Sequence, residues 1–591
     1  MSLPHKKPLS LHTIPVETVY RILDNLSQLD ILLSMQNVCS RLDAILNVYY
    51  RYQKFTELKI NTRKENKAKL NHLAKALRNN TTITKLTYSF NNISETEGKH
   101  LALALEKNTT LTTLIFITTK FEVNALRQLT FGLQRNKSIT TLEFRSNRLF
   151  SNETYHLIEV LQNNTVLTKL ILETYPLEKN DTQYLAQILE NNKTLTSLHL
   201  ECNNINSEKI LYITKILQSN TAALTELLLI RNPIGTQGIQ YLTKALQINR
   251  TLKTLHLTGS NIDDQRVENL SHIIRKNTTL TTLFLDINII TDIGVKFLTE
   301  ALSTNQTLTT LNLGHNNIDD HGIQHLAELL SENNTLTTLD ISGNCFDIYG
   351  IQYLCRALQT NKTLKVIDLS ENTIHLLSLK HLYEAMQNNT ALTTLHIRRN
   401  RINGKLTEYL GLTLQISKTL TTLDLQMNQI DCEGVRFLAE PLETNSTLTT
   451  LRLGRNSIGN SGIQYLSRVL KKNTTLTTLN LERNCFTHEG IQYLVDGLLK
   501  NTTLTIIDLE GNKIDDHGAE QLAEVLQKNT TLIEVNLLAN NIGDEGTNHL
   551  VAAVQYNRML RTIHLTSNDI HNVIPVDLDE FFNERLYSKF S

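Results

Sequence analysis

Residues 308–335 read LTTLNLGHNNIDDHGIQHLAELLSENNT and are the clearest copy of a segment that recurs every 28 residues. The recurrence holds from Ile83 to the C-terminal region, with a single one-residue insertion near residues 222–223. A fixed period of about 20 to 50 residues indicates stacked structural repeats and settles the fold before any other signal. The eighteen repeats begin at Ile83, Leu111, Ile139, Leu167, Leu195, Leu224, Leu252, Leu280, Leu308, Leu336, Leu364, Leu392, Leu420, Leu448, Leu476, Leu504, Leu532 and Leu560.

The apolar residues of one repeat follow two spacings. Leu311 and Leu313, at positions 4 and 6, are two residues apart and therefore share one face of a short strand. Ile323 and Leu326, at positions 16 and 19, begin an apolar series at helical spacing. Gly322, at position 15, is expected to mark the turn into the helix. One repeat cannot enclose its own apolar faces, but stacked neighbours bury them against each other.

Asparagine recurs at two positions of the repeat. Position 9, as in Asn316, is Asn in fifteen of the eighteen repeats. Its side chain can bond backbone groups of its own and the next repeat, which predicts a ladder of Asn side chains. Position 26, as in Asn333, follows the helix, where Asn tolerates the left-handed conformation that ends helices. The ladder is expected to be interrupted at Thr119, Tyr175 and Ser260.

The pattern LxxLxLxxNxI followed by a helix resembles the leucine-rich repeat, and its length resembles the ribonuclease-inhibitor-like subclass. The resemblance implies an α/β leucine-rich-repeat solenoid. It would be a horseshoe with a parallel sheet on the concave face and helices on the convex face, preceded by a small N-terminal helical domain. The predicted parts are a flexible lead (1–10), a helical module (11–53), a degraded capping repeat (54–82), eighteen repeats (83–572) and a C-terminal cap (573–591).

One proline interrupts the helical pattern. Pro441 lies within the predicted helix of the repeat that begins at Leu420. Proline lacks a backbone N–H and costs about 3 kcal/mol in a helix interior. We therefore expect a local break at residues 440–441.

Residues 11–53 contain no repeat and resemble an F-box. Four elements of that family occur in order: IPVE at 14–17, ILDNL at 22–26, DILL at 30–33 and VCSR at 38–41. Leu42 departs from the pattern, because many members have an aromatic residue there. A helical cap over the first repeat is the alternative, and the two roles are compatible. The adaptor-binding residues that the resemblance implies are Ile14, Pro15, Glu17, Ile22, Leu23, Leu32, Leu33 and Val38.

Composition excludes several classes of partner and location. The formal net charge is zero, which argues against nucleic acid. No apolar run reaches the roughly 18 residues that span a membrane, and no signal peptide is evident at the N-terminus. We therefore expect a cytoplasmic or nuclear protein with no membrane contact.

No enzyme motif is found. The Gly404–Lys405 pair lacks the upstream glycine of a phosphate-binding loop. The six cysteines have no metal-binding spacing, and the Asp319–Asp320–His321 segment is typical of a helix start. We expect no catalytic residue, no metal and no cofactor.

Positions 5, 7 and 8 of each repeat are expected to point to the concave side. They include apolar residues in the N-terminal half, which predicts a binding patch; the alternatives are that helices or a neighbouring chain cover these residues, or that some are simply scattered. In the C-terminal half they are charged, as in a recognition surface or a self-neutralising mosaic. The candidate partner-binding residues are Ile115, Ile117, Ile171, Ile230, Phe284, Arg398, Arg399, Arg452, Arg455 and Arg483.

The combined resemblance implies a protein–protein interaction scaffold, a substrate-recognition subunit of a cullin–RING ubiquitin ligase. The F-box-like module would dock the ligase's adaptor, and the concave face would hold an unknown protein substrate. Two alternatives stay open. The repeats also resemble those of the Ran GTPase-activating protein, although the acidic stretch that follows the repeats in that family is missing here. The other alternative is a stand-alone scaffold similar to ribonuclease inhibitor, although this chain lacks the many cysteines of that family.

Overall fold

The computed structural model describes residues 56–61, 67–89, 92–146, 151–173, 176–219 and 223–570, together with Val16 and Val19. The chain forms two compact units, Met1–Asn261 and Ile262–Ser591. We call them the N-terminal body and the C-terminal body. The expected lead, helical module and C-terminal cap lie outside the described residues, apart from Val16 and Val19.

The N-terminal body alternates strands and helices. Strands of successive repeats pair in parallel from β1 to β10, and β3 and β5 form a separate short pair. The strands are β1 (Glu57–Asn61), β2 (Lys85–Ser89), β3 (Asn92–Ile93), β4 (Thr113–Ile117), β5 (Lys120–Phe121), β6 (Thr141–Arg145), β7 (Lys169–Glu173), β8 (Ser197–Glu201), β9 (Glu226–Leu228) and β10 (Thr254–His256). The helices are α5 (Lys67–Asn79), α6 (Glu95–Lys107), α7 (Val123–Arg135), α8 (Ser151–Asn163), α9 (Lys179–Asn191), α10 (Ser207–Ser219) and α11 (Gly235–Ile248).

The C-terminal body repeats the same arrangement, and β11 to β21 pair successively in parallel. Its strands are β11 (Thr282–Phe284), β12 (Thr310–Asn312), β13 (Thr338–Asp340), β14 (Val366–Asp368), β15 (Thr394–His396), β16 (Thr422–Asp424), β17 (Thr450–Arg452), β18 (Thr478–Asn480), β19 (Ile506–Asp508), β20 (Glu534–Asn536) and β21 (Thr562–His564). Its helices are α12 (Asp264–Ile274), α13 (Asp292–Leu302), α14 (Asp320–Glu332), α15 (Ile348–Thr360), α16 (Leu376–Met386), α17 (Thr407–Ile416, after a short 3-10 turn at Gly404–Leu406), α18 (Cys432–Thr444), α19 (Gly459–Lys472), α20 (His488–Lys500), α21 (Asp516–Lys528) and α22 (Asp544–Tyr556).

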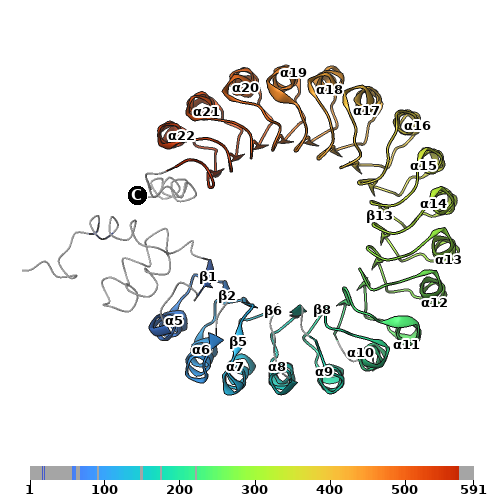
Figure 1. Ribbon diagram of the computed structural model, residues 1–591, viewed down its shortest axis with the longest axis vertical. Helices are drawn as coiled ribbons and strands as arrows, with labels where there is room; N and C mark the ends of the chain where they lie inside the picture. Colours follow the sequence, from blue (N-terminus) through green and yellow to red (C-terminus); the bar gives the residue numbers. More distant parts are fainter. Residues whose placement is uncertain are drawn as a thin grey trace, which may run out of the picture. The chain divides into compact units, whose positions relative to one another are not determined.

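Within each body the strands line one side and the helices the other, as the solenoid prediction requires (Figure 1). Paired residues are one repeat apart: Leu86 pairs with Leu114, and Leu311 pairs with Leu339. Parallel strands need a crossover connection, and each repeat supplies one with its helix. The α/β leucine-rich-repeat solenoid predicted from the sequence is therefore confirmed.

The predicted core positions are buried. Leu311 and Leu313 of the strand and Ile323 and Leu326 of the helix are all fully enclosed. Each such side chain contributes about 1.5–3 kcal/mol relative to an exposed one. The residues at the two spacings found in the sequence therefore form the inward face of one strand and the inward face of one helix.

The Asn ladder at position 9 exists, but it joins each repeat to the preceding one. Asn316 Nδ2 donates to the carbonyl of Leu285 in the preceding repeat and to that of Leu313 in its own, each at 3.0 Å. Its Oδ1 accepts the N–H of Ile290, again in the preceding repeat, at 3.0 Å. The predicted direction was wrong because the carbonyl of Leu285, just past the end of β11, is the group that lacks a strand partner.

The position-26 asparagines form a second ladder and are not left-handed. Asn333 is extended, with φ −74° and ψ 126°. Its Nδ2 donates to the carbonyl of Leu302 in the preceding repeat, and its Oδ1 accepts the N–H groups of Thr335 and Leu336. The extended conformation lets one side chain bridge two repeats while the chain turns back toward the sheet.

Left-handed backbone occurs instead at position 8, directly before the ladder Asn. Its φ is 52° at His315, 51° at Arg399 and 57° at Arg455. Side chains with a Cβ rarely adopt this conformation, and the hydrogen bonds of the following Asn hold it in place.

Gly322 does not make the turn into α14, because it is already the third residue of that helix. Asp319 starts the helix by accepting the N–H of His321 at 2.8 Å. A Cβ at position 322 would lie 2.5 Å from Ile318 Cγ2 and 3.2 Å from the Cα of Asp292. The glycine therefore allows close packing against the start of the preceding helix.

The expected break at Pro441 is absent, because α18 continues through it to Thr444. Leu438 and Leu442, on either side of the proline, are buried and hold the helix against its neighbours. Proline leaves the carbonyl four residues earlier, that of Phe437, without its helical donor. Gly411 of the preceding helix faces that carbonyl, and a Cβ there would collide with it. The glycine at position 411 thus leaves room for this carbonyl.

Candidate functional site

The strand faces of the C-terminal body carry a cluster centred on a buried carboxylate, Asp424, at the end of β16. Only 1% of its side chain is exposed, and a histidine and two arginines of neighbouring repeats surround its Oδ2. His396 Nδ1 lies at 3.5 Å, Arg398 Nε at 3.9 Å and Arg452 Nη1 at 3.6 Å. We call these four residues the Asp424 cluster. Two guanidinium groups face one carboxylate, so their summed charge with Asp424 is positive. Both arginines are directed toward the same carboxylate oxygen.

The loop-edge arginines are Arg399, Arg455 and Arg483, which follow the strands at position 8. Each forms an ion pair with a glutamate of an adjacent repeat. Arg399 Nη1 lies 3.0 Å from Glu371, Arg455 Nε 2.8 Å from Glu482 and Arg483 Nη2 3.6 Å from Glu510. The side chains remain about half exposed.

The five predicted arginines therefore do not form one row. Arg398 and Arg452 belong to the strand-face cluster, whereas the other three lie on the loops with their own carboxylates. All five lie within 4.0 Å of an acidic side chain. This pairing is the self-neutralising arrangement that the sequence left open, and among these five arginines only the two of the Asp424 cluster share a single carboxylate.

Carboxylate and amide side chains at position 5 hold the backbone that leaves the strand, a role that we did not predict from the sequence. Asp340 Oδ1 accepts the N–H of Ser342 at 2.9 Å, and Asn312 Oδ1 accepts that of Gly314 at 2.8 Å. Burial raises the pKa of Asp340, and the nearby charge of Asp368 adds to the effect. The recurrence of Asp or Asn directly after the strand leucine of position 4 is the signal that could have revealed this role.

The apolar candidates of the N-terminal body are not an exposed patch. Ile115 is 7% exposed and Ile171 is 8% exposed. Their strands are five residues long, and Glu143 of β6 pairs between them. Ile117 and Ile230 are partly exposed. Of the alternatives that the sequence left open, the first two residues follow the one in which the side chains are covered: Ile115 lies between Thr87 and Glu143 on the adjacent strands.

Phe284 lies at the end of β11 in the C-terminal body and is partly exposed. The adaptor-binding candidates of the F-box-like segment lie outside the described residues. These are Ile14, Pro15, Glu17, Ile22, Leu23, Leu32, Leu33 and Val38.

One Ser–His–Glu arrangement occurs in the N-terminal body. His199 Nε2 lies 2.9 Å from Ser197 Oγ and 3.5 Å from Glu226 Oε2. A hydrolytic triad needs the acid on the other ring nitrogen, so that the first is free to take the serine proton. Burial lowers the pKa of His199. The arrangement is a polar contact between strands rather than an activated nucleophile.

Among the described residues, no group of three or more His, Cys, Asp or Glu side chains could hold a metal ion. Likewise, no helix in that part of the chain is long and apolar enough to cross a membrane.

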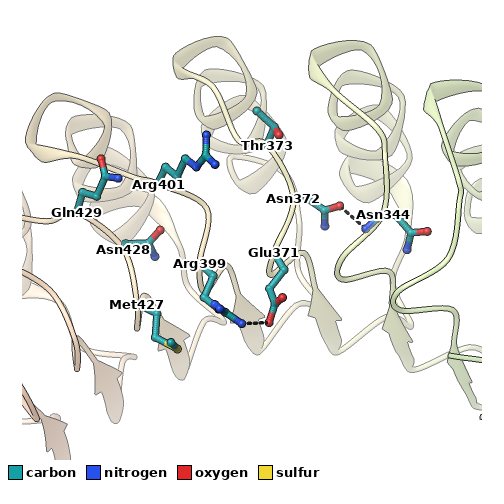
Figure 2. Close-up of a pocket in the computed structure, with 9 residues that line it drawn as sticks. All are labelled: Asn344, Glu371, Asn372, Thr373, Arg399, Arg401, Met427, Asn428 and Gln429. Carbon is teal, nitrogen blue, oxygen red and sulfur yellow. Dashed lines mark hydrogen bonds and ion pairs between the residues drawn. The ribbon is translucent and has the colours of Figure 1, made fainter. Parts of the chain in front are cut away.

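A polar pocket of about 520 Å³ opens on the loops that follow β13 to β16 (Figure 2). We call it the Arg401 pocket. The loop-edge pair of Arg399 and Glu371 borders it, and Arg401 enters it from the same loop as Arg399. Its lining residues are Asn344, Glu371, Asn372, Thr373, Arg399, Arg401, Met427, Asn428 and Gln429.

Comparison with known proteins agrees with this geometry. Ten segments match the family described as leucine-rich repeat. This chain is built of leucine-rich repeats. The matched segments are residues 191–208, 249–270, 304–327, 332–355, 417–439, 444–467, 472–495, 500–523, 528–547 and 556–574.

Several solved structures are similar over parts of their length. An internalin (InlF) from Listeria monocytogenes is 22% identical with a TM-score of 0.35, covering 64% of this chain and 88% of that one. Actin-binding site 2 of leiomodin-1 is 27% identical with a TM-score of 0.23, covering 26% and 88%. TLR13 in its complex with ssRNA13 is 16% identical with a TM-score of 0.47, covering 87% and 81%. No curated protein matches the sequence.

Leucine-rich repeats serve as protein-interaction scaffolds, and the repeats of this chain indicate that coarse function. A solenoid does not specify its partner, which is chosen by side chains on its surface.

Proposed function

We propose that this protein is the substrate-recognition subunit of a cullin–RING ubiquitin ligase and carries no catalytic residue of its own. The F-box-like signature over residues 14–41 supports adaptor docking, and it is the observation on which this role rests. Such a subunit works in the cytoplasm or nucleus, and we propose that location.

The Asp424 cluster is our candidate for substrate binding. Arg398, which follows β15, and Arg452, at the end of β17, lie on either side of Asp424 of β16 and share this buried counter-ion. Arginine is enriched at binding hot spots because its planar group makes several directed hydrogen bonds. Asp340 and Asp368 precede the cluster, and Glu482 and Asp508 follow it. The proposed partner therefore presents an acidic group at the cluster, with basic residues on either side.

Adaptor docking is tested by co-purification. Leu32→Asp in the full chain should abolish co-purification with the ligase adaptor, because a charged group would enter an apolar docking surface. Leu103→Asp is the matched control, since Leu103 is an exposed leucine of α6. Retention of the adaptor by Leu32→Asp, or its loss from both variants, would refute the docking role.

A further inference from the structure

The Arg401 pocket contains an arginine whose charge is not balanced. Arg399 is paired with Glu371, the acidic side chain of the lining set, at 3.0 Å. In the described part of the chain, Arg401 has no ion-pair or hydrogen-bond partner, although its side chain lines the pocket. The pocket therefore has a surplus positive charge.

The other lining groups are of two kinds. The amides of Asn344, Asn372 and Asn428 are committed to the position-9 ladder, as shown by the bonds of Asn372 to the carbonyls of Ile341 and Leu369. The side chains of Thr373 and Gln429 take no part in it. Both are exposed and occupy position 10, as Arg401 does, in the repeats before and after it. Figure 2 shows Arg401 extending between the loops that carry these two residues.

The backbone fixes the base of the arginine. Arg399 and Arg401 are both left-handed, with φ of 51° and 57°. Asn400 between them is buried, donates to the carbonyl of Leu369 at 2.9 Å, and has its N–H bonded to Asn428 Oδ1 at 2.8 Å. Two unfavourable conformations on either side of an anchored residue direct the two arginines apart, one to Glu371 and the other into the pocket.

We propose that the Arg401 pocket binds an oxyanion, a carboxylate or phosphate group carried by a protein segment. Arg401 supplies a guanidinium group that can hold two oxygens at once, and Thr373 and Gln429 supply further donors. The pocket's volume suits a few side chains rather than a folded surface. Because the site lies on the loops rather than on the strand faces, it is separate from the Asp424 cluster and does not depend on the ligase role.

The site is tested with three fluorescein-labelled octapeptides, in which glycine alternates with aspartate, with phosphoserine or with asparagine. Fluorescence anisotropy with the full chain should show binding of the aspartate or the phosphoserine peptide and not of the asparagine peptide. The tighter of the two charged probes identifies the source of the oxyanion. Equal binding of all three, or no binding of a charged peptide, would overturn the proposal.

Two pocket variants with opposite expected effects on peptide binding make the test specific to the Arg401 pocket. Arg401→Ala should weaken binding about tenfold, as loss of a charged hydrogen bond does, and Arg401→Lys should retain part of it. Glu371→Gln should strengthen binding, because it releases Arg399 to the same anion. Arg356→Ala and Glu332→Gln are the matched controls, exposed residues of α15 and α14 with the same charge changes. The proposal fails if either pocket variant behaves like its control while circular dichroism shows both folded.

Discussion

The strand faces of the two bodies are built from the same repeat but differ at position 5. In the N-terminal body this position includes Ile115 and Ile171, which are nearly buried within five-residue strands. In the C-terminal body it includes Asp340 and Asp424 at the ends of three-residue strands, and each accepts the N–H two residues later. The same position therefore contributes to the core in one body and shapes the exit of the strand in the other.

This difference shows that composition along a strand face does not by itself reveal a binding surface. The apolar series of the N-terminal body suggested an exposed patch, yet part of it is covered. The charged series of the C-terminal body was compatible with a recognition surface or a self-neutralising mosaic, and each of the five predicted arginines is paired. A candidate site is distinguished instead by positive charge that remains after neighbouring acidic and basic side chains have paired. Such charge remains in the Asp424 cluster and at Arg401.

The largest effect should come from the core that both bodies share. Leu311→Ala should lower the free energy of unfolding by about 2–5 kcal/mol, because a fully buried leucine leaves a cavity. Thr310→Ala, at the neighbouring position of β12 and partly exposed, should cost far less. Urea denaturation measures both, and equal losses would contradict the assignment of the inward face.

The next effect tests position 5 in the N-terminal body. Ile115→Ala should cost about 2–4 kcal/mol, since the side chain is 7% exposed, and Ile117→Ala should cost less, since it is partly exposed. Denaturant titration of the two variants compares neighbouring positions of one strand. If Ile115→Ala were silent, the residue would be a surface group and the contrast between the bodies would disappear.

A smaller effect is expected in the Asn ladder. Asn344→Ala should cost about 1–3 kcal/mol, because the carbonyls of Leu313 and Ile341 lose a donor within the stack. Asn334→Ala is the control, an exposed asparagine beside the second ladder. In thermal unfolding, Asn344→Ala should melt at a lower temperature than Asn334→Ala. Overlap of the two melting curves would show that the ladder does not stabilise the stack at this repeat.

The smallest effect concerns the buried acid of β13. Because the pKa of Asp340 is raised in the folded state, its ionised form opposes folding, and stability is gained as pH falls through that pKa. Asp340→Asn should therefore raise the free energy of unfolding at pH 7 while an amide oxygen still accepts the Ser342 N–H. The difference should shrink on acidification toward pH 4. Asn312→Asp, on the neighbouring strand, should do the reverse. A difference that does not change with pH would show that ionisation is not its cause.

The fold was predictable because its determinants are periodic. The spacing of Leu311, Leu313 and Ile323 predicts the strand, the helix and their inward faces from a single repeat, without reference to the adjacent repeats. Direction and conformation were not predictable in this way. The extended backbone at Asn333 and the left-handed one at position 8 depend on hydrogen bonds made to the preceding repeat.

The candidate site was predictable only as residue types. The arginines at positions 5, 7 and 8 were identified, but their partners were not, since pairing depends on which side chains of adjacent repeats meet. Arg401 was missed because position 10 lies beyond the strand face. An arginine at that position with no acidic residue at position 10 of the adjacent repeats, Thr373 and Gln429, is the signal that was available.

The most direct test of the account compares the two bodies as binding surfaces. Affinity purification from cells at low salt would use the wild-type chain, Arg398→Ala with Arg452→Ala, and Ile117→Ala with Ile230→Ala, followed by quantification of the co-purifying proteins other than the ligase adaptor. The arginine pair should be needed to retain these proteins, and the isoleucine pair should not. Loss of the same proteins only from the isoleucine variant would place recognition in the N-terminal body and contradict it.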